Sequence, residues 1–101
     1  MRATVERNSD TLTLKLQGRF DVSAHRAFRD AYTPGLTAPE VREFVVDLGE
    51  VGYLDSSALG MLLMLRERAQ TAGKAVALSN CGGTVKQILD IANFGRLFAI
   101  R

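Results

Sequence analysis

Serine hydroxyls and carboxylates gather at one point of the sequence. Asp55, Ser56 and Ser57 stand directly before an apolar stretch that runs to about residue 72. In the simpler interpretation one of the three caps a helix, because Asp and Ser side chains accept hydrogen bonds from free amide groups at helix starts. In the other interpretation the serine lies at the helix start on a side of the helix that is available to a partner. Asp21, which ends a predicted strand, can cap the helix that follows it, a role for which Ser23 competes.

An enzyme built on these residues finds little support in the sequence. A serine nucleophile needs a base, but the only histidine is His25, and the residues around Ser56 do not form Gly-x-Ser-x-Gly. Asp21 and Asp55 could form the carboxylate pair of a glycosidase, yet a chain of 101 residues leaves no room for a substrate cleft beyond its core. The same carboxylates could hold Mg²⁺ beside a serine hydroxyl, and in a kinase reaction that metal would arrive with ATP. We therefore expect no catalysis, no resident metal and no cofactor, with His25 at the surface.

The composition is that of an ordinary globular domain. Hydrophobic residues make up 47% of the chain and charged residues 24%, and the net charge of +2 is too small to predict a nucleic acid or an anionic membrane as partner. The single cysteine, Cys81, excludes an intrachain disulfide and is expected to be partly buried. Neither a secretory leader pattern nor an apolar run of membrane-spanning length occurs, so we expect a cytoplasmic protein.

The order of the elements predicts an α/β fold in a single domain spanning residues 1–101. Apolar runs predict strands at 3–7, 11–17, 43–48 and 74–78, with a short closing strand at 97–100. Helical spacing predicts helices at 23–32, 56–72 and 85–93, and turn residues predict loops at 33–41 and 49–55. The first helix should bury Ala24, Ala27, Phe28 and Ala31, and the last should bury Val85, Ile88, Leu89 and Ala92. Strands separated by helices pair mainly in parallel, so we expect a mixed sheet with an N-terminal β-hairpin and helices largely on one face.

The helix predicted at 56–72 has two apolar sides. At 100° per residue, one stripe can face the core: Ala58, Met61, Leu62, Leu65, Ala69 and Ala72. The other side holds Ser56, Gly60 and Glu67, together with Leu59, Leu63 and Met64. A small domain does not need a second apolar side unless something covers it. Either a neighbouring helix of the same domain covers Leu59 and Leu63, or a partner protein does, and the sequence leaves both open.

Two motifs carry a resemblance to a known family. The run Asp55-Ser56-Ser57-Ala58-Leu59-Gly60 resembles the phosphorylation motif of anti-sigma factor antagonists, the bacterial single-domain members of the STAS family. Gly18-Arg19-Phe20-Asp21 resembles that family's Gly-x-(apolar)-Asp segment, whose Asp lies near the phosphorylated serine. The resemblance covers essentially the whole chain and implies the STAS fold. It departs at Ala58, where many members have glycine, and because alanine is the better helix former we expect no loss of function.

The resemblance also implies a function. In that family a serine kinase that is also an anti-sigma factor phosphorylates the serine directly after the Asp, which is Ser56 here. It implies a partner-switching regulator of transcription that binds this kinase when unphosphorylated, releases it when phosphorylated, and is restored by a serine phosphatase. The partner-binding residues would be Asp21, Asp55, Ser57, Leu59, Gly60, Leu63 and Met64. We expect a monomer that contacts neither nucleic acid nor membrane. The alternative is a constitutive STAS module of a larger signalling assembly, which binds a protein or small ligand and in which Ser56 only caps its helix.

Overall fold

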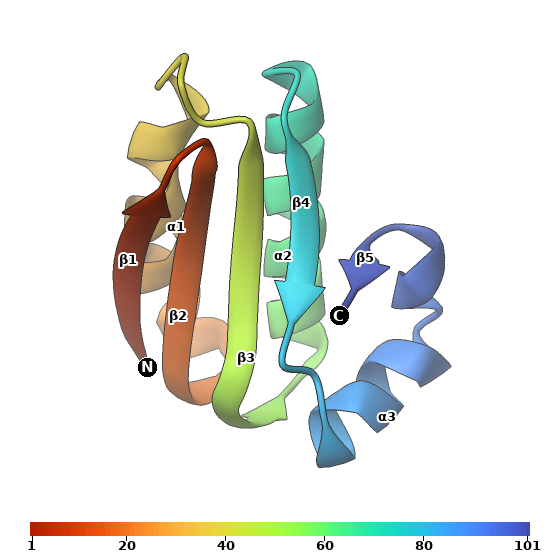
Figure 1. The fold of residues 1–101 in the computed structure, drawn as a ribbon. Coiled ribbons are helices and arrows are strands. Elements are labelled where there is room, and N and C mark those ends of the chain that lie inside the picture. Colours follow the sequence, from red (N-terminus) through yellow and green to blue (C-terminus); the bar gives the residue numbers. More distant parts are fainter.

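The computed structural model describes all 101 residues. Strands and helices alternate along the chain after an initial hairpin (Figure 1). The strands are β1 (Arg2–Asn8), β2 (Thr11–Phe20), β3 (Glu43–Leu54), β4 (Ala75–Ser79) and β5 (Ala99–Ile100). The α-helices are α1 (His25–Leu36), α2 (Ser56–Thr71) and α3 (Gly83–Ile91), and the short 3-10 helices are η1 (Val22–Ala24) and η2 (Phe94–Arg96). None of these helices has both the length and the hydrophobicity needed to span a lipid bilayer.

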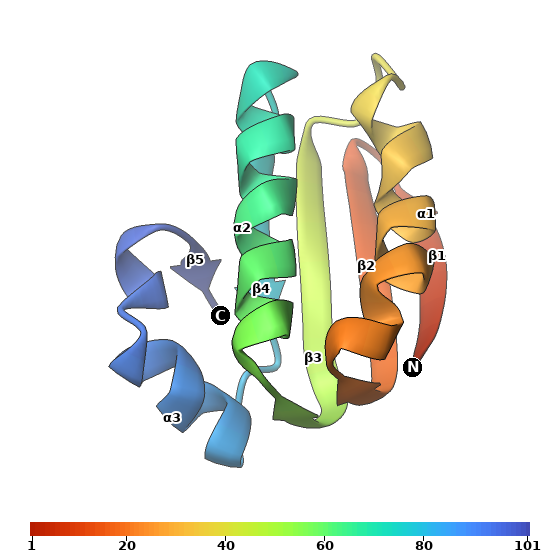
Figure 2. The ribbon, with the colours of Figure 1, turned by 180° about the vertical axis from the view of Figure 1, so that it is seen from behind.

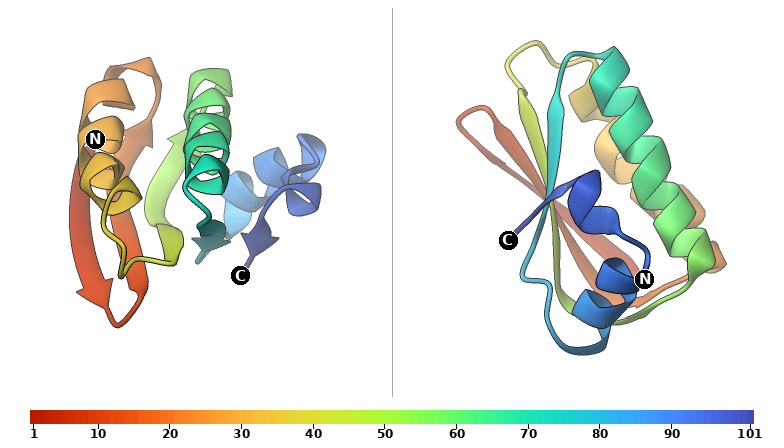
Figure 3. Two further views of the ribbon diagram at one scale, coloured as in Figure 1. Left: turned by 90° about the horizontal axis from the view of Figure 1, so that it is seen from above. Right: turned by 90° about the vertical axis from the view of Figure 1, so that its right-hand side faces the viewer.

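The strands form one sheet in the order β1-β2-β3-β4-β5, in which β1 and β2 are antiparallel and the other neighbours are parallel. Each parallel connection moves one strand further in the same direction. Right-handed crossovers of this kind place their helices on the same face. Figures 2 and 3 show α1 and α2 side by side across that face, with α3 beyond α2. The expected mixed sheet, with an N-terminal hairpin and helices on one face, is confirmed.

The core lies between the sheet and the two helices that cross it. The alternating leucines of β2, Leu12, Leu14 and Leu16, point into it, as their period of two predicts. On α2 the predicted stripe is buried from Ala58 to Ala69, whereas Ala72 is exposed because the helix ends at Thr71. The burial of one α2 stripe fixes the rotation of the helix and therefore the direction of its other side.

Strand β3 is longer than predicted. The expected loop at 49–55 is wrong: the chain continues as strand to Leu54, and only Asp55 separates it from α2. The reason is tertiary, since β2 is also long and pairs with this second half, with Gln17 opposite Glu50 and Phe20 opposite Leu54. Two register shifts in that pairing absorb the irregular spacing. The turn-like residues Gly49 and Gly52 therefore lie within a strand.

Helix α1 is also longer than predicted, because it continues through Pro34 to Leu36 where a loop at 33–41 was expected. Its last turn is held by packing: Gly35 is buried, and a Cβ added there would lie 2.7 Å from Cε1 of Phe44. The predicted stripe of this helix was partly wrong, since Ala27 is exposed and Tyr32 is buried. Tyr32 packs edge-on against Phe28, with ring centroids 5.3 Å apart. In α3, Val85 and Leu89 are buried as predicted, and Ile88 and Ala92 are partly buried.

Candidate functional site

Asp55, and not Ser56 or Ser57, caps the start of α2. Asp55 has an extended backbone, and its Oδ1 accepts a hydrogen bond of 2.9 Å from the amide of Ala58. Asp55 is therefore the N-cap, and the interpretation in which Ser56 caps the helix is wrong. Ser56 is the first helical residue and is exposed, while Ser57 is half-buried. The Ser56 side chain is left accessible at a helix N-terminus, where free amide groups and the helix dipole favour added negative charge.

Asp21 lies at the adjacent strand end. Phe20 pairs with Leu54 across the sheet, and the amide of Asp55 donates a hydrogen bond of 3.3 Å to the carbonyl oxygen of Phe20. The residues that follow these two strands, Asp21 and Asp55, therefore lie side by side at the same edge of the sheet. The structure thus brings together the two motifs that are 34 residues apart in sequence.

The carboxylate of Asp21 is held in place by its own loop. It accepts hydrogen bonds from the amide of Ser23 at 3.0 Å and from the hydroxyl of Ser23 at 2.5 Å, and so it caps η1. Arg19 approaches the same carboxylate at 3.5 Å, while its guanidinium lies 4.8 Å above the ring centre of Tyr53. The Ser23 hydrogen bonds, with a smaller contribution from Arg19, lower the pKa of Asp21, so the carboxylate is charged at neutral pH. Asp21 is thus a helix cap that also lies beside the start of α2.

The outward side of α2 divides into a covered and an uncovered part. Leu59 is half-buried and packs against the core, so the same domain covers it. Leu63 and Met64 keep 38% and 41% of their surface exposed, and Gly60 is exposed with nothing within 4 Å of where a Cβ would be. The apolar surface available to a partner therefore consists of Leu63 and Met64, next to the open Gly60.

A cavity of about 320 Å³ lies between the start of α2 and the loop after β2. It is lined by Val22, His25, Ser57, Gly60, Met61 and Met64. Val22, which is 70% exposed, was not predicted for the site, although an apolar residue between Asp21 and Ser23 in a turn was a usable signal. His25 was expected only to be at the surface, and its place in this cavity depends on how α1 and α2 pack.

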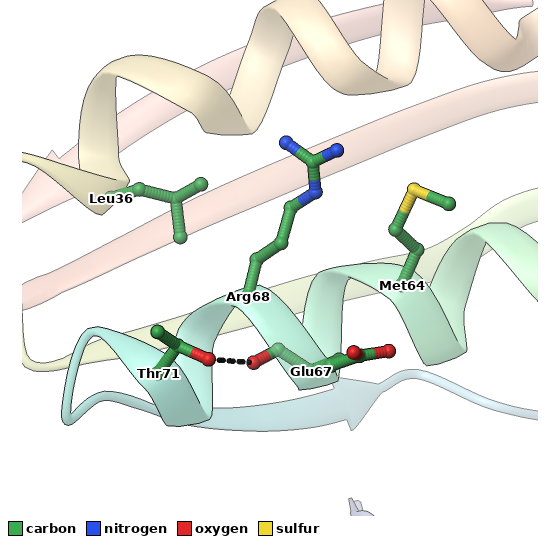
Figure 4. A pocket seen from close by; sticks show the side chains of 5 residues that line it. All are labelled: Leu36, Met64, Glu67, Arg68 and Thr71. Carbon is green, nitrogen blue, oxygen red and sulfur yellow. Dashed lines mark hydrogen bonds between the residues drawn. The ribbon is translucent and has the colours of Figure 1, made fainter.

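A second cavity, of about 420 Å³, lies further along the same two helices. Figure 4 shows its lining side chains: Leu36 from α1, and Met64, Glu67, Arg68 and Thr71 from α2. No three His, Cys, Asp or Glu side chains come together anywhere in a group that could hold a metal ion. The cavity that Ser57 lines lies next to the exposed Ser56 in sequence, at the start of α2.

Comparison with known proteins identifies the family. The family model described as "Mlab, STAS domain" matches residues 3–99. The chain belongs to the STAS domain family. A STAS-domain containing protein of Pseudomonas aeruginosa is 52% identical to it over 89 residues, which are 88% of this chain and 86% of that protein. The expectation of STAS membership is thereby confirmed.

Solved structures show the same fold at low sequence identity. A Thermotoga maritima protein described as a candidate anti-sigma factor antagonist has a TM-score of 0.85 at 18% identity, over 97% of this STAS domain and 84% of that protein. The anti-sigma factor antagonist SpoIIAA of Bacillus matches in its unphosphorylated form with a TM-score of 0.76 and in its phosphorylated form with 0.74, each at 17% identity. These two matches cover 98% of this domain and 86% and 90% of the SpoIIAA chains. The STAS fold predicted from the sequence is confirmed.

Proposed function

We propose that this STAS domain is an anti-sigma factor antagonist whose binding to a regulatory partner is switched by phosphorylation of Ser56. When Ser56 is unphosphorylated, the domain binds an anti-sigma factor that is also its serine kinase. Phosphorylation releases that partner, and a serine phosphatase restores the binding form. The domain acts in the cytoplasm as a monomeric, non-enzymatic component of this switch.

The observation that carries the proposal is the separation of two roles at the start of α2. Asp55 makes the cap hydrogen bond, so the helix does not need the Ser56 hydroxyl. An exposed hydroxyl without a structural duty, at the first position of a helix, can accept a phosphoryl group while the helix remains intact. The exposed Leu63 lies two turns further along α2, on the same side as Ser56, and supplies apolar contact area for the partner.

The switch depends on charge at the site. A phosphate adds about −1.5 to −2 charge at neutral pH, beside the carboxylates of Asp55 and Asp21. Two like charges about 4 Å apart repel by roughly 1 kcal/mol in water and about 4 kcal/mol at a partly desolvated surface. A partner that meets this surface with apolar groups, carboxylates or bound nucleotide phosphates therefore loses affinity. The close match to both forms of SpoIIAA supports a switch that needs little change in the fold.

Site-directed phosphorylation tests the proposal. Wild type, Ser56→Ala and Ser57→Ala are incubated with the cognate kinase and labelled ATP, and the modified residue is mapped by mass spectrometry. Wild type and Ser57→Ala should be labelled at Ser56, and Ser56→Ala should not be labelled. Because Ser57 is half-buried in the cavity wall while Ser56 is exposed, the two variants form a matched pair. Full labelling of Ser56→Ala would contradict the assignment.

The alternative is a constitutive STAS module that binds its partner without a phosphorylation switch. The observation that favours it is the name of the matching family model, which refers to Mlab and not to an anti-sigma factor antagonist. In this case Ser56 stays unmodified in the cell, and Ser56→Ala and wild type bind the partner equally under all conditions. Mass spectrometry of the protein isolated from its own cells separates the two functions, because only the first requires a phosphate on Ser56.

A further inference from the structure

Two cavities follow one another between α1 and α2, and we call them together the interhelix groove. Met64 lines both cavities. One end is bounded by Val22 and Ser57 at the helix starts, and the other by Leu36 and Thr71 at the helix ends. Ser57 and Thr71 are 14 residues apart on α2, so the groove is about 21 Å long at a rise of about 1.5 Å per residue. This length fits roughly four turns of a second helix laid along it.

The groove combines apolar side chains with one arginine that has no side-chain partner. Its exposed apolar side chains are Val22 and Met64, with Leu36 half-buried at the far end. Arg68 makes no hydrogen bond or ion pair with any other side chain, and Figure 4 shows it extending from α2 toward α1, across the groove. Arginine in the last turn of a helix also interacts favourably with the helix dipole, but that role does not require the side chain to cross to a neighbouring helix.

A second arginine, Arg29, lies on the side of α1 that faces the groove, because it stands one turn after His25 and two turns before Leu36, which both line the cavities. Burial raises the pKa of Tyr32, and the positive charges of Arg68 and Arg29 oppose that rise, which agrees with this placement. Arg29 approaches Asp30 at 4.0 Å, a distance that neutralises little at an exposed position. Glu67, which precedes Arg68 on α2, is the one carboxylate among the residues that line the groove. The middle of the groove therefore carries two arginines against one lining glutamate.

We propose that the interhelix groove binds an acidic amphipathic α-helix of a partner protein. Apolar side chains of that helix, spaced three or four residues apart, pack against Val22, Met64 and Leu36, and its flanking carboxylates meet Arg68 and Arg29. The proposal rests on the proposed function only in taking the ligand to be a protein. It extends the contact surface about 20 Å beyond Ser56, to a part of α2 where a phosphate on Ser56 has no direct contact.

This occupant would also respond to the negative charge at the groove's other end. An acidic helix that reaches the start of α2 approaches Asp55 and, after modification, phosphorylated Ser56. Repulsion at that end then opposes the attraction of the arginines in the middle, so one helix can respond to the modification without any change in the groove.

Photocrosslinking in the protein's own host cells tests the proposal. The crosslinking residue p-benzoylphenylalanine is placed at Thr71 in the groove, at Gln70 on the adjacent outward side of α2, and at Leu63, two turns beyond Ser56 on the same side of α2. Crosslinked peptides are identified by mass spectrometry. The proposal expects crosslinking from Thr71, and not from Gln70, to a protein segment with apolar residues at helical spacing and flanking Asp or Glu.

A charge swap then tests the chemistry. The captured segment is synthesised as a peptide, and its affinity is measured for wild type, Arg68→Glu and the matched control Gln70→Glu. Arg68→Glu should weaken binding by roughly tenfold, Gln70→Glu should leave it unchanged, and a peptide with Lys in place of its acidic residues should reverse the order.

Three results would overturn the groove proposal: no crosslink at Thr71, a crosslink there to a lipid or small molecule, or a segment without acidic residues. If Leu63 still captures the kinase in any of these cases, the proposed function stands while the groove proposal falls. If Thr71 captures an acidic helix whose affinity is the same for phosphorylated and unphosphorylated Ser56, the groove proposal stands while the switch falls.

Discussion

Replacing Leu63 by glutamate separates partner binding from folding. Leu63 is 38% exposed, whereas its neighbour Leu62 is fully buried against the sheet. Surface substitutions usually change the free energy of unfolding by less than about 0.5 kcal/mol, which is about 2–4 °C in Tm for a domain of this size. Leu62→Ala leaves a cavity and should cost about 2–5 kcal/mol, or more than about 10 °C. Leu63→Glu should therefore unfold close to the wild-type temperature.

The effect on binding follows from the surface that Leu63 still exposes. Full burial of a leucine side chain contributes about 1.5–3 kcal/mol, so burying the remaining 38% contributes about 0.6–1.1 kcal/mol. Loss of that contact alone corresponds to about a threefold to sixfold weaker Kd. The new carboxylate adds a desolvation cost when the partner covers it, so Leu63→Glu should exceed this range.

Calorimetric titration with the proposed anti-sigma factor partner measures the effect on binding, and thermal unfolding followed by circular dichroism measures the effect on folding, both on one set of proteins. Gln70→Glu is the matched control, since it adds the same charge at an exposed position of the same helix. It should bind like wild type. A large fall in the Tm of Leu63→Glu would show that Leu63 belongs to the core. Unchanged affinity would show that the partner does not cover this side of α2. Either result refutes the assignment of Leu63 to the partner surface.

Three further predictions concern the framework of the site. Asp55→Ala should lower the unfolding free energy by about 0.5–2 kcal/mol through loss of the N-cap, and Asp55→Asn should restore most of it, as denaturant unfolding will show. Gly35→Ala should lower the free energy of unfolding by about 1–3 kcal/mol, because its Cβ would lie 2.7 Å from Cε1 of Phe44. Gly60→Ala has open space for its Cβ, so it should stabilise α2 by up to about 1 kcal/mol while weakening the partner complex. Because the pKa of Asp21 is lowered in the folded state, its carboxylate contributes stability above the unfolded-state pKa of about 3.9 that is lost as pH falls through the folded-state pKa. Asp21→Asn should therefore lose less stability than wild type between pH 5 and pH 2, and an equal loss in both proteins would contradict this.

Local sequence patterns were sufficient for most of the fold. The alternation of Leu12, Leu14 and Leu16 and the helical spacing from Ala58 to Ala69 each predicted the face that is buried. The pattern failed where tertiary contacts outweigh local preference. Gly49 and Gly52 read as turn residues, yet pairing with the long β2 keeps them in β3. In α1, burial of Gly35 holds a last turn that Pro34 disfavours.

The candidate site was predictable only where local sequence determines it. Asp55 and Ser56 are adjacent in sequence, so their place at a helix start follows from local signals. The cap role could not be divided among Asp55, Ser56 and Ser57 by spacing, because it depends on which side chain reaches the Ala58 amide. The interhelix groove was not predictable, since its walls are set by the distance and rotation between α1 and α2. Sequence periodicity reports which side of a helix is apolar, and it does not report what lies opposite.

The central claim is tested most directly by the affinity of the proposed anti-sigma factor partner for unphosphorylated and Ser56-phosphorylated protein. The two forms are measured under identical conditions, and amide NMR spectra are recorded for both. Phosphorylation should weaken binding by between a few-fold and about a thousandfold, in line with repulsion of about 1–4 kcal/mol. Amide shifts should be confined to the start of α2 and the Asp21 loop, and Ser56→Ala should bind at least as well as wild type. Equal or tighter binding by the phosphorylated protein, or shifts spread through the whole sheet, would contradict a local electrostatic switch at Ser56.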